Sequence, residues 1–243
     1  MKHICRICLM ILFVSQHAAA QKHDKLIIKQ IIPNVFEYTT FHEYEGAQVS
    51  SNGMYVVTSL GAVLLDTPWD TTQFQPLLDS IWMKHQQRAT YCIATHYHDD
   101  CTAGFNYYAL KGIKTYSSQQ TYEACIKFGK PAANYRFSKD TTFKIGEYTF
   151  KTFYPGAGHT ADNIVVYVDE ARTLFGGCFV KSIEADGLGY TGEAHISEWK
   201  ESIRRVKKKF KNMYFLIPGH DGGTSPTALN HTVYLIDQHQ QKK

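Results

Sequence analysis

The sequence has no apolar run long enough to cross a membrane and no strong excess of charge of either sign. Its 243 residues include 26 lysines and arginines against 22 aspartates and glutamates, a formal net charge of +4. This near neutrality argues against a dedicated nucleic-acid surface. One basic run, residues 204–209, falls in an amphipathic helical stretch and is better explained as a solvated helix face. With 44% hydrophobic and 20% charged residues, the composition also excludes disordered and multi-span membrane proteins.

No Gly/Ser-rich linker and no change in composition divides the chain, so we expect one domain over residues 21–243. The first 20 residues are different. They begin with a basic segment, continue with the apolar residues 7–14 and end in three alanines. This order is typical of a secretory signal peptide, and the apolar part is too short to span a bilayer. We therefore predict a signal peptide at residues 1–20, export to the periplasm and no stable membrane association.

Cysteine is scarce after the predicted cleavage point, and no two cysteines lie close together in the sequence. Four remain, at Cys92, Cys101, Cys125 and Cys178. A disulfide-dependent exported domain would show a framework of paired cysteines, and a structural zinc site typically uses a Cys-x-x-Cys pair. Residues 21–243 contain neither pattern. Cys92 and Cys125 have apolar neighbours and are expected to pack as small hydrophobic residues, whereas Cys178 requires another explanation.

Short β-prone runs and helical patterns occur in both halves of the chain. The helical patterns cover residues 71–85, 102–110, 118–128 and 197–210, with a last helix starting at 226. The polar residues 42–47 are expected to form a loop that joins the two arms of a hairpin. This loop either folds over a cleft or is a simple surface loop. Strands in both halves, each flanked by helices, fit two packed sheets with helices outside.

Two histidines and a carboxylate follow one of these apolar runs, residues 91–94. They are His96, His98 and Asp100. In extended backbone the two histidine rings point to the same side, and imidazole is the commonest metal ligand at neutral pH. An isolated His-x-His pair, however, is more often a surface or capping feature than a metal site.

Three further candidate ligands, His159, Cys178 and His220, also follow apolar strands, each next to a glycine. Strand ends of one edge converge in space, and loops on a rigid scaffold commonly carry functional residues. The six side chains suffice for two tetrahedral zinc sites that keep open positions, which is the mark of catalytic zinc. The remaining histidines lack this context and are expected to be solvent or core residues.

Together these motifs resemble those of the metallo-β-lactamases. The matching segments are His96-Tyr97-His98-Asp99-Asp100, Gly158-His159-Thr160, Asp162-Asn163, Gly177-Cys178, Lys181 and Pro218-Gly219-His220. The likeness is to the dizinc subclass with one three-histidine site and one Asp-Cys-His site, and it spans essentially the whole mature chain. Other hydrolases of the superfamily usually carry a histidine at the position of Cys101 and a bridging aspartate at the position of Cys178.

The resemblance implies an α+β fold, an αββα sandwich of two mixed sheets with helices on the outer faces. It also implies two zinc ions per subunit, one held by His96, His98 and His159 and the other by Asp100, Cys178 and His220. Such an enzyme opens the β-lactam ring of penicillins, cephalosporins and carbapenems, and so confers antibiotic resistance. A zinc-bound hydroxide would attack the lactam carbonyl, and Asp100 would orient this nucleophile and assist proton transfer.

The resemblance further implies that Lys181 pairs with the substrate carboxylate, although a lysine considered alone is more often a surface charge. Asp66, Asp162 and Asn163 are candidates for accepting a hydrogen bond from a metal-bound histidine. For the last two residues, a structural role in a turn is the alternative. The family often carries Asn-Leu-Gly where this chain has Gly187-Leu188-Gly189, so no side-chain amide from this position is expected near the lactam carbonyl.

We expect a monomer that acts on small β-lactam molecules and has no nucleic-acid partner. Two other functions compete with this interpretation. A thioester or phosphodiester hydrolase of the same fold is one, because fold does not determine function. Cys178, the missing extra histidine and the predicted export argue against it. A non-catalytic zinc-binding protein is the other, but such proteins more often use His-rich runs than two open sites beside a lysine.

Overall fold

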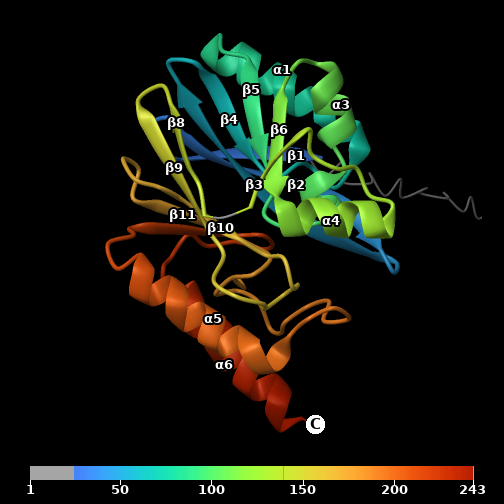
Figure 1. The fold of residues 1–243 in the computed structure, drawn as a ribbon, viewed down its shortest axis with the longest axis vertical. Helices are drawn as coiled ribbons and strands as arrows, with labels where there is room; N and C mark the ends of the chain where they lie inside the picture. The colour runs from blue at the N-terminus through green and yellow to red at the C-terminus, as the bar shows by residue number, and fades with distance from the viewer. Residues whose placement is uncertain (1–24, 139, 243) are drawn as a thin grey trace, which may run out of the picture.

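Among the described residues, seven strands in chain order form the larger of two β-sheets (Figure 1). The computed structural model describes residues 25–138 and 140–242, so the predicted signal peptide lies outside the described residues. The strands are β1 (Leu26–Ile32), β2 (Val35–Tyr44), β3 (Ala47–Thr58), β4 (Gly61–Leu65), β5 (Ala89–Ile93), β6 (Lys114–Ser118) and β7 (Tyr135–Phe137). The first four strands pair antiparallel, and β4 to β7 pair parallel, so the sheet is mixed.

A second mixed sheet has the strand order β12-β11-β10-β9-β8. Its strands are β8 (Thr142–Ile145), β9 (Tyr148–Phe153), β10 (Val165–Val168), β11 (Thr173–Gly177) and β12 (Phe215–Pro218). Strands β11 and β12 pair parallel, whereas the other neighbours pair antiparallel. The last strand therefore returns to the sheet only after a long crossover, and that crossover contains a helix and an extended loop.

Helices lie outside the two sheets (Figure 1). They are a 3-10 turn η1 (Thr71–Gln73), α1 (Phe74–His85), α2 (Asp99–Thr102), α3 (Phe105–Leu110), α4 (Gln119–Phe128), α5 (Ile196–Lys209) and α6 (Ala228–Gln241). Helices α1 and α3 pack on the first sheet, and α5 and α6 pack on the second. Ser118 caps α4 by accepting a hydrogen bond from the Thr121 backbone N–H at 3.0 Å.

Three buried apolar clusters fill the spaces between these four layers. One lies between α1, α3 and the first sheet, one between the second sheet and α5 and α6, and one between the two sheets. Side chains alternate between the two faces of β3 and so contribute to two of these clusters. Tyr55 faces the helices, whereas Met54 and Val56 face the other sheet. Fully burying a side chain of this kind stabilises the fold by about 1.5–3 kcal/mol. The predicted αββα sandwich is confirmed.

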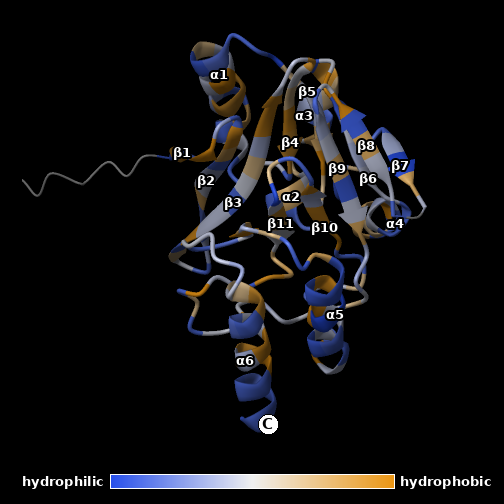
Figure 2. Cartoon of the chain, turned by 90° about the vertical axis from the view of Figure 1, so that its left-hand side faces the viewer, coloured by the Kyte–Doolittle hydropathy of each residue, from blue (hydrophilic) through white to orange (hydrophobic). Residues whose placement is uncertain are grey.

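The basic run at residues 204–209 occupies the solvent side of α5, as predicted. Val206 is buried, whereas Arg204, Arg205 and the three lysines that follow are exposed. The hydrophilic outer surface of α5 and of the last turns of α6 is visible in Figure 2. This charge therefore belongs to an ordinary amphipathic helix face.

The hairpin predicted around residues 42–47 is present, but its loop is shorter than expected. Strands β2 and β3 remain paired up to Tyr44 and Ala47, leaving a two-residue turn. Glu45 and Gly46 both adopt positive φ, at 51° and 79°, as the tight turns of hairpins require. The pattern misled because this end of the hairpin projects from the sheet and has no buried face to impose apolar alternation.

The helix predicted over residues 102–110 begins earlier and is divided into α2 and α3. The break lies at Gly104, whose backbone N–H donates to Thr67 Oγ1 at 3.1 Å. A Cβ atom on Gly104 would lie only 3.0 Å from the Thr67 Cβ atom, so the two segments are in very close contact. The earlier start has a consequence for function, because it places Asp99 and Asp100 in the first turn of α2.

Among the residues that the structure describes, no helix is both long and apolar enough to cross a membrane. The four cysteines of this part of the chain are buried and have free thiols. Cys92 and Cys125 are fully buried, so they pack as small hydrophobic residues, as expected.

Candidate metal centre

The six predicted ligands lie together where strands of both sheets end. Cys178 follows β11 directly, and His220 follows β12 by two residues. Asn52 of β3 fixes the end of β12, because its amide donates to the carbonyl oxygens of Pro218 at 3.1 Å and Asp221 at 2.7 Å. Gly219 is required here, since a Cβ atom would lie 2.5 Å from the Cys178 backbone nitrogen. The two sheets thus bring ligands from both halves of the sequence to one edge.

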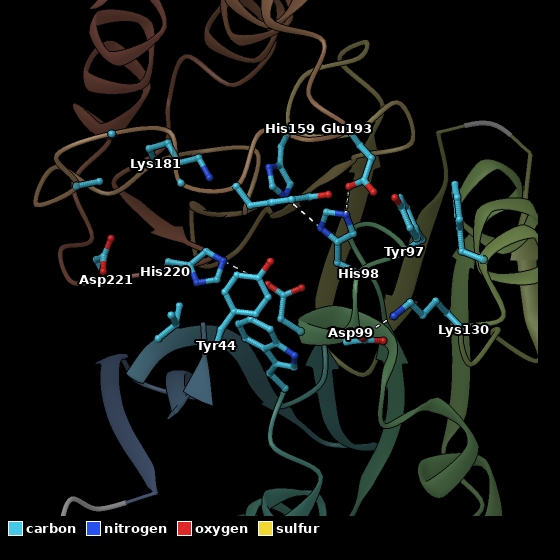
Figure 3. A pocket seen from close by; sticks show the side chains of 18 residues that line it. Tyr44, Tyr97, His98, Asp99, Lys130, His159, Lys181, Glu193, His220 and Asp221 are labelled. Carbon is cyan, nitrogen blue, oxygen red and sulfur yellow. Dashed lines mark hydrogen bonds and ion pairs between the residues drawn. The ribbon is translucent and has the colours of Figure 1, made fainter. Parts of the chain in front are cut away.

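Three histidine nitrogens form the first group. His98 Nδ1 lies 3.0 Å from His96 Nε2 and 3.2 Å from His159 Nε2. Figure 3 shows His98 and His159 pointing toward one another at the cavity. Burial lowers the pKa of His96 and of His159 well below the usual histidine value, so both rings are neutral at pH 7. Neutral imidazole is the form that binds metal.

The outer nitrogens of two of these rings face hydrogen-bond acceptors. His96 Nδ1 lies 3.2 Å from Thr95 Oγ1, whose own hydroxyl donates to Asp66. His98 Nε2 lies 3.0 Å from a Glu193 carboxylate oxygen. These acceptors keep the ring protons on the outer nitrogens, so the inner lone pairs of His96 and His98 converge. Converging lone pairs repel one another unless a cation lies between them, so this group suits a metal ion.

A carboxylate, a thiol and an imidazole form the second group. Asp100 Oδ2 lies 3.2 Å from Cys178 Sγ and 3.3 Å from His220 Nε2, and the last two atoms are 3.2 Å apart. Oxygen, sulfur and nitrogen donors in one small cluster are a typical ligand set for zinc. The predicted ligands of the second site are therefore adjacent, although they come from three distant parts of the chain.

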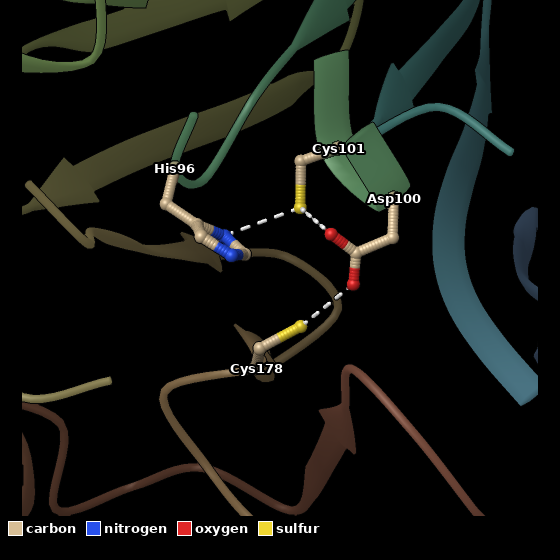
Figure 4. Close-up of side chains that lie close together, drawn as sticks. All are labelled: His96, Asp100, Cys101 and Cys178. Carbon is tan, nitrogen blue, oxygen red and sulfur yellow. Dashed lines mark hydrogen bonds between the residues drawn. The ribbon is translucent and has the colours of Figure 1, made fainter. Parts of the chain in front are cut away.

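Cys101 is a buried neighbour that the sequence reasoning did not place in the site. Its Sγ lies 3.2 Å from His96 Nδ1 and within 4.8 Å of the Cys178 Sγ (Figure 4). Against the effect of burial, the Cys101 thiol and then His220 lower the pKa of Cys178. Burial raises the pKa of Cys101 itself, so Cys101 keeps its proton and Cys178 is the thiolate. The thiolate is the form of cysteine that binds metal.

The contacts of Asp66, Asp162 and Asn163 differ from the expected acceptance of a histidine proton. Asp66 accepts from the Thr95 backbone N–H at 2.6 Å and from the Thr95 hydroxyl at 2.8 Å. Asn163 accepts from the Thr160 backbone N–H at 3.0 Å, which is a turn contact. Among the described residues, the buried Asp162 carboxylate has no hydrogen-bond partner. Asp66 thus acts on His96 only through Thr95, and Asn163 braces the loop that carries His159.

Two partners of the ligand histidines had no signal in the sequence. His220 Nδ1 donates to the Ser50 carbonyl oxygen on β3, a backbone group that any residue type would supply. Glu193 lies on a loop far from His98 in the chain. A pattern of acidic residues near the ligand motifs could not have indicated either contact, because both depend on how the hairpin and the loop fold over the strand ends.

A cavity of about 630 Å³ opens over both groups. Its wall is rich in aromatic side chains, contributed by Tyr44, Trp69, Tyr97, Phe128 and Tyr190. Lys181 also lines the cavity although its side chain is buried, and burial lowers the pKa of its ammonium group. Within residues 25–138 and 140–242, no carboxylate forms an ion pair with Lys181, so this cation is available to a ligand (Figure 3).

A family model described as the metallo-beta-lactamase superfamily matches residues 46–220, which include all six predicted ligands. The chain belongs to the metallo-beta-lactamase superfamily. Its curated relatives include a metallo-beta-lactamase type 2 of Elizabethkingia meningoseptica, 38% identical over 227 residues that cover 93% of this chain and 91% of the relative. Another is the metallo-beta-lactamase IND-1 of Chryseobacterium indologenes, 37% identical over 98% of this chain and 100% of the relative.

Solved metallo-beta-lactamases share the same architecture. The enzyme from Pontibacter korlensis superposes with a TM-score of 0.84 at 34% identity, covering 87% of this chain and 99% of that one. The metallo-beta-lactamase IND-7 gives the same TM-score at 37% identity and covers 98% of its own chain. The family resemblance inferred from the ligand motifs is therefore confirmed, as is the α+β sandwich that it implied.

Proposed function

We propose that this metallo-beta-lactamase is a zinc hydrolase that opens the lactam ring of penicillins, cephalosporins and carbapenems and so confers antibiotic resistance. The observation that carries the proposal is the pair of adjoining ligand groups at the floor of one cavity, with the unpaired Lys181 beside them. Support also comes from relatives named metallo-beta-lactamases that match nearly the full length of this chain. A cleft with convergent polar groups and perturbed pKa values is where catalysis is expected.

His96, His98 and His159 would hold one zinc ion, and Asp100, Cys178 and His220 would hold a second. When bound, the metal supplies an electrophile for the lactam carbonyl, lowers the pKa of a water toward about 7 and stabilises charge on the departing nitrogen. The neutral His96 and His159 and the Cys178 thiolate are already in the protonation states that bind metal, whereas, against the effect of burial, Cys178 and Asp100 raise the pKa of His220 well above its usual value. Loading of the first group therefore releases few protons, whereas loading of the second releases the proton of His220.

Lys181 binds and orients the substrate by pairing with its carboxylate. Its backbone N–H donates to Thr232 Oγ1 of α6 at 2.9 Å, which fixes the start of the side chain. Its ammonium group lies 5.5 Å from the centre of the Trp199 ring, so aromatic packing limits its movement. A charge held in place before binding loses little entropy when the substrate arrives.

Asp100 lines the cavity and would present a proton-accepting oxygen to the attacking water. Although burial opposes it, the nearby His220 and His96 lower the pKa of Asp100 well below the usual aspartate value. The carboxylate is therefore ionised at neutral pH and can orient the attacking water and receive its proton.

The proposal includes export to the periplasm and action as a monomer without nucleic-acid partners. The signal-peptide pattern of residues 1–20 supports export. The near-neutral net charge supports the absence of a nucleic-acid partner. The domain spans residues 21–243 in this proposal.

The test compares Cys178→Ser with Cys125→Ser, since both remove a buried thiol but only the first lies in the centre. Purified proteins are assayed with a carbapenem and with a thioester, before and after chelation, and bound zinc is counted by mass spectrometry. We expect lactam opening that chelator abolishes and zinc restores, and loss of one zinc in Cys178→Ser alone. Lactam hydrolysis that survives complete metal removal, or thioester hydrolysis in its place, would contradict the proposal.

A further inference from the structure

Glu193 contacts His98, one of the predicted metal ligands, from a loop that lines the cavity. One of its carboxylate oxygens lies 3.0 Å from His98 Nε2. A dashed line marks this contact in Figure 3. We propose that Glu193 is a positioning residue with two linked tasks. It holds His98 in the tautomer that presents Nδ1 to the first metal, and it fixes the loop between β11 and α5 over the cavity. The inference rests on the proposed zinc site.

The first task follows from the chemistry of the imidazole ring. His98 Nδ1 faces the two inner nitrogens of His96 and His159, so it must be free of a proton to bind metal there. A neutral histidine carries one proton, on either nitrogen. A carboxylate is only an acceptor, so Glu193 favours the proton on Nε2 and leaves the Nδ1 lone pair free.

Glu193 suits this task better than the acceptor facing His96. The outer nitrogen of His96 faces Thr95 Oγ1 and the Cys101 thiol. Neither group is charged, because a hydroxyl is neutral and burial raises the pKa of Cys101. Among the described residues, His159 Nδ1 has no hydrogen-bond partner at all. His98 is therefore the one member of the first group whose tautomer is set by a charged acceptor, and a charge-assisted hydrogen bond is about twice as strong as a neutral one.

Two tyrosines flank the Glu193 carboxylate. The ring centres of Tyr97 and Tyr190 lie 4.6 Å and 6.0 Å from that of His98, both in edge-on arrangements. The negative charge of Glu193 raises the pKa of the Tyr190 phenol, and it adds to the effect of burial on Tyr97. Tyr97 in turn stacks on Phe128 of α4, with ring centres 5.0 Å apart. Aromatic side chains thus flank the hydrogen bond between Glu193 and His98.

The second task follows from how the loop is held. Its first part is anchored by the Ser182 hydroxyl, which donates to the Gly222 carbonyl, and by His231 Nε2, which lies 2.8 Å from the Ala185 carbonyl oxygen. Its middle contains Gly187 and Gly189, and a Cβ atom on either would meet nothing within 4 Å. The two glycines line the cavity, whereas Leu188 between them is buried in the apolar cluster under α5 and α6.

The far part of the loop is anchored beside the metal ligands. The His195 backbone N–H donates to the carbonyl oxygen of Gly158 at 2.8 Å, directly before His159. Glu193, two residues earlier, adds a polar contact between this loop and His98, beside the edge-on ring contact of Tyr190. The loop that meets the substrate is therefore tied to the first metal site, and occupancy of one should order the other, since such coupling is reciprocal.

The test uses Glu193→Ala, the conservative Glu193→Gln and a control, Glu198→Gln. Glu198 is the matched control because it also pairs with a histidine, His195, at 3.4 Å, but lies outside the cavity. Zinc affinity of each site is measured by competition with a chromophoric chelator. The tautomer of His98 is read from nitrogen chemical shifts of the metal-free protein, and thermal unfolding reports folding.

We expect Glu193→Ala to weaken the first zinc by about 10- to 100-fold, leave the second within about threefold and give His98 a mixture of tautomers. Glu193→Gln keeps an acceptor oxygen and should recover most of the affinity, whereas Glu198→Gln should match the parent. In loaded enzyme, Glu193→Ala should raise KM more than it lowers kcat, because the loop loses its anchor.

First-site affinity and a single Nε2–H tautomer that persist in Glu193→Ala, with parent-like thermal unfolding, would overturn the inference. Its failure is distinguishable from failure of the proposed function. Parent protein that binds two zinc ions with the expected dependence on Glu193, yet opens no lactam, would refute only the function. Lactam hydrolysis that is chelator-sensitive in a variant with unaltered zinc affinity would refute only the inference.

Discussion

Replacing Lys181 with alanine should weaken substrate binding much more than it slows the chemical step. The Lys181 side chain is only 7% exposed, faces the cavity and has no carboxylate partner among the described residues. Its charge is therefore free to pair with the substrate carboxylate. A hydrogen bond to a charged group contributes about 1.5–3 kcal/mol, so the variant should raise KM by about 10- to over 100-fold.

The assay compares a carbapenem acid with its methyl ester, in the parent, Lys181→Ala and Lys130→Ala. Lys130 is the matched control, because it also lines the cavity but is already paired with Asp99 at 2.6 Å. Lys181→Ala should raise KM for the acid only, and kcat should stay within about threefold since Lys181 touches no reacting atom. Lys130→Ala should change KM for either substrate by less than about threefold, as expected for a partly exposed ion pair.

An unchanged KM for the acid in Lys181→Ala, with parent-like thermal unfolding, would show that the substrate carboxylate binds elsewhere. An equal rise in KM for acid and ester would also refute the reasoning, because it would mean that the side chain shapes the cavity rather than pairing with the carboxylate. Loss of the buried ammonium should not itself lower stability. Burial lowers the pKa of Lys181, which means that the fold disfavours the charged form.

Two further variants test other parts of the site. Gly187→Asn should change kcat/KM by less than about tenfold in steady-state assays. Thermal unfolding should be unchanged, because a Cβ atom at this position meets nothing within 4 Å. A gain of about a hundredfold would show that the missing amide limits the enzyme. Asp162→Asn should stabilise the protein increasingly between about pH 4 and about pH 7 in chemical denaturation. Burial raises the pKa of Asp162, so the parent is stabilised at low pH and loses this contribution as the pH rises through the raised value; a pH-independent difference would contradict the assignment.

The ligand set and the layered fold could be predicted from the sequence because both depend on local patterns of residue type. Alternating or continuous apolar runs marked most strands, and the residues that follow a strand lie at a sheet edge whatever the rest of the fold does. His96, His98 and Asp100 come from one such strand end, and Cys178 and His220 from two others. The types of these side chains alone indicated a metal with nitrogen, oxygen and sulfur ligands.

The predictions were weakest where the outcome depended on contacts between distant segments. The division of the helix at Gly104 depends on contact with Thr67, and the length of the hairpin depends on how far β2 and β3 stay paired beyond the sheet. Neither feature has a hydrophobic periodicity or a capping residue that could indicate it in the sequence, since tertiary packing overrides local propensity.

The amino-acid sequence by itself determined which atoms can bind metal, because ligand chemistry belongs to the side chain. Only the tertiary structure decided how those atoms are presented. Ser50 orients His220 through a backbone carbonyl, and Glu193 reaches His98 from a loop 95 residues away. Cys101 lies close enough to Cys178 to keep it a thiolate. Tautomer and protonation state depend on distances of a few ångströms between segments that are far apart in the chain, and no local pattern in the sequence records such distances.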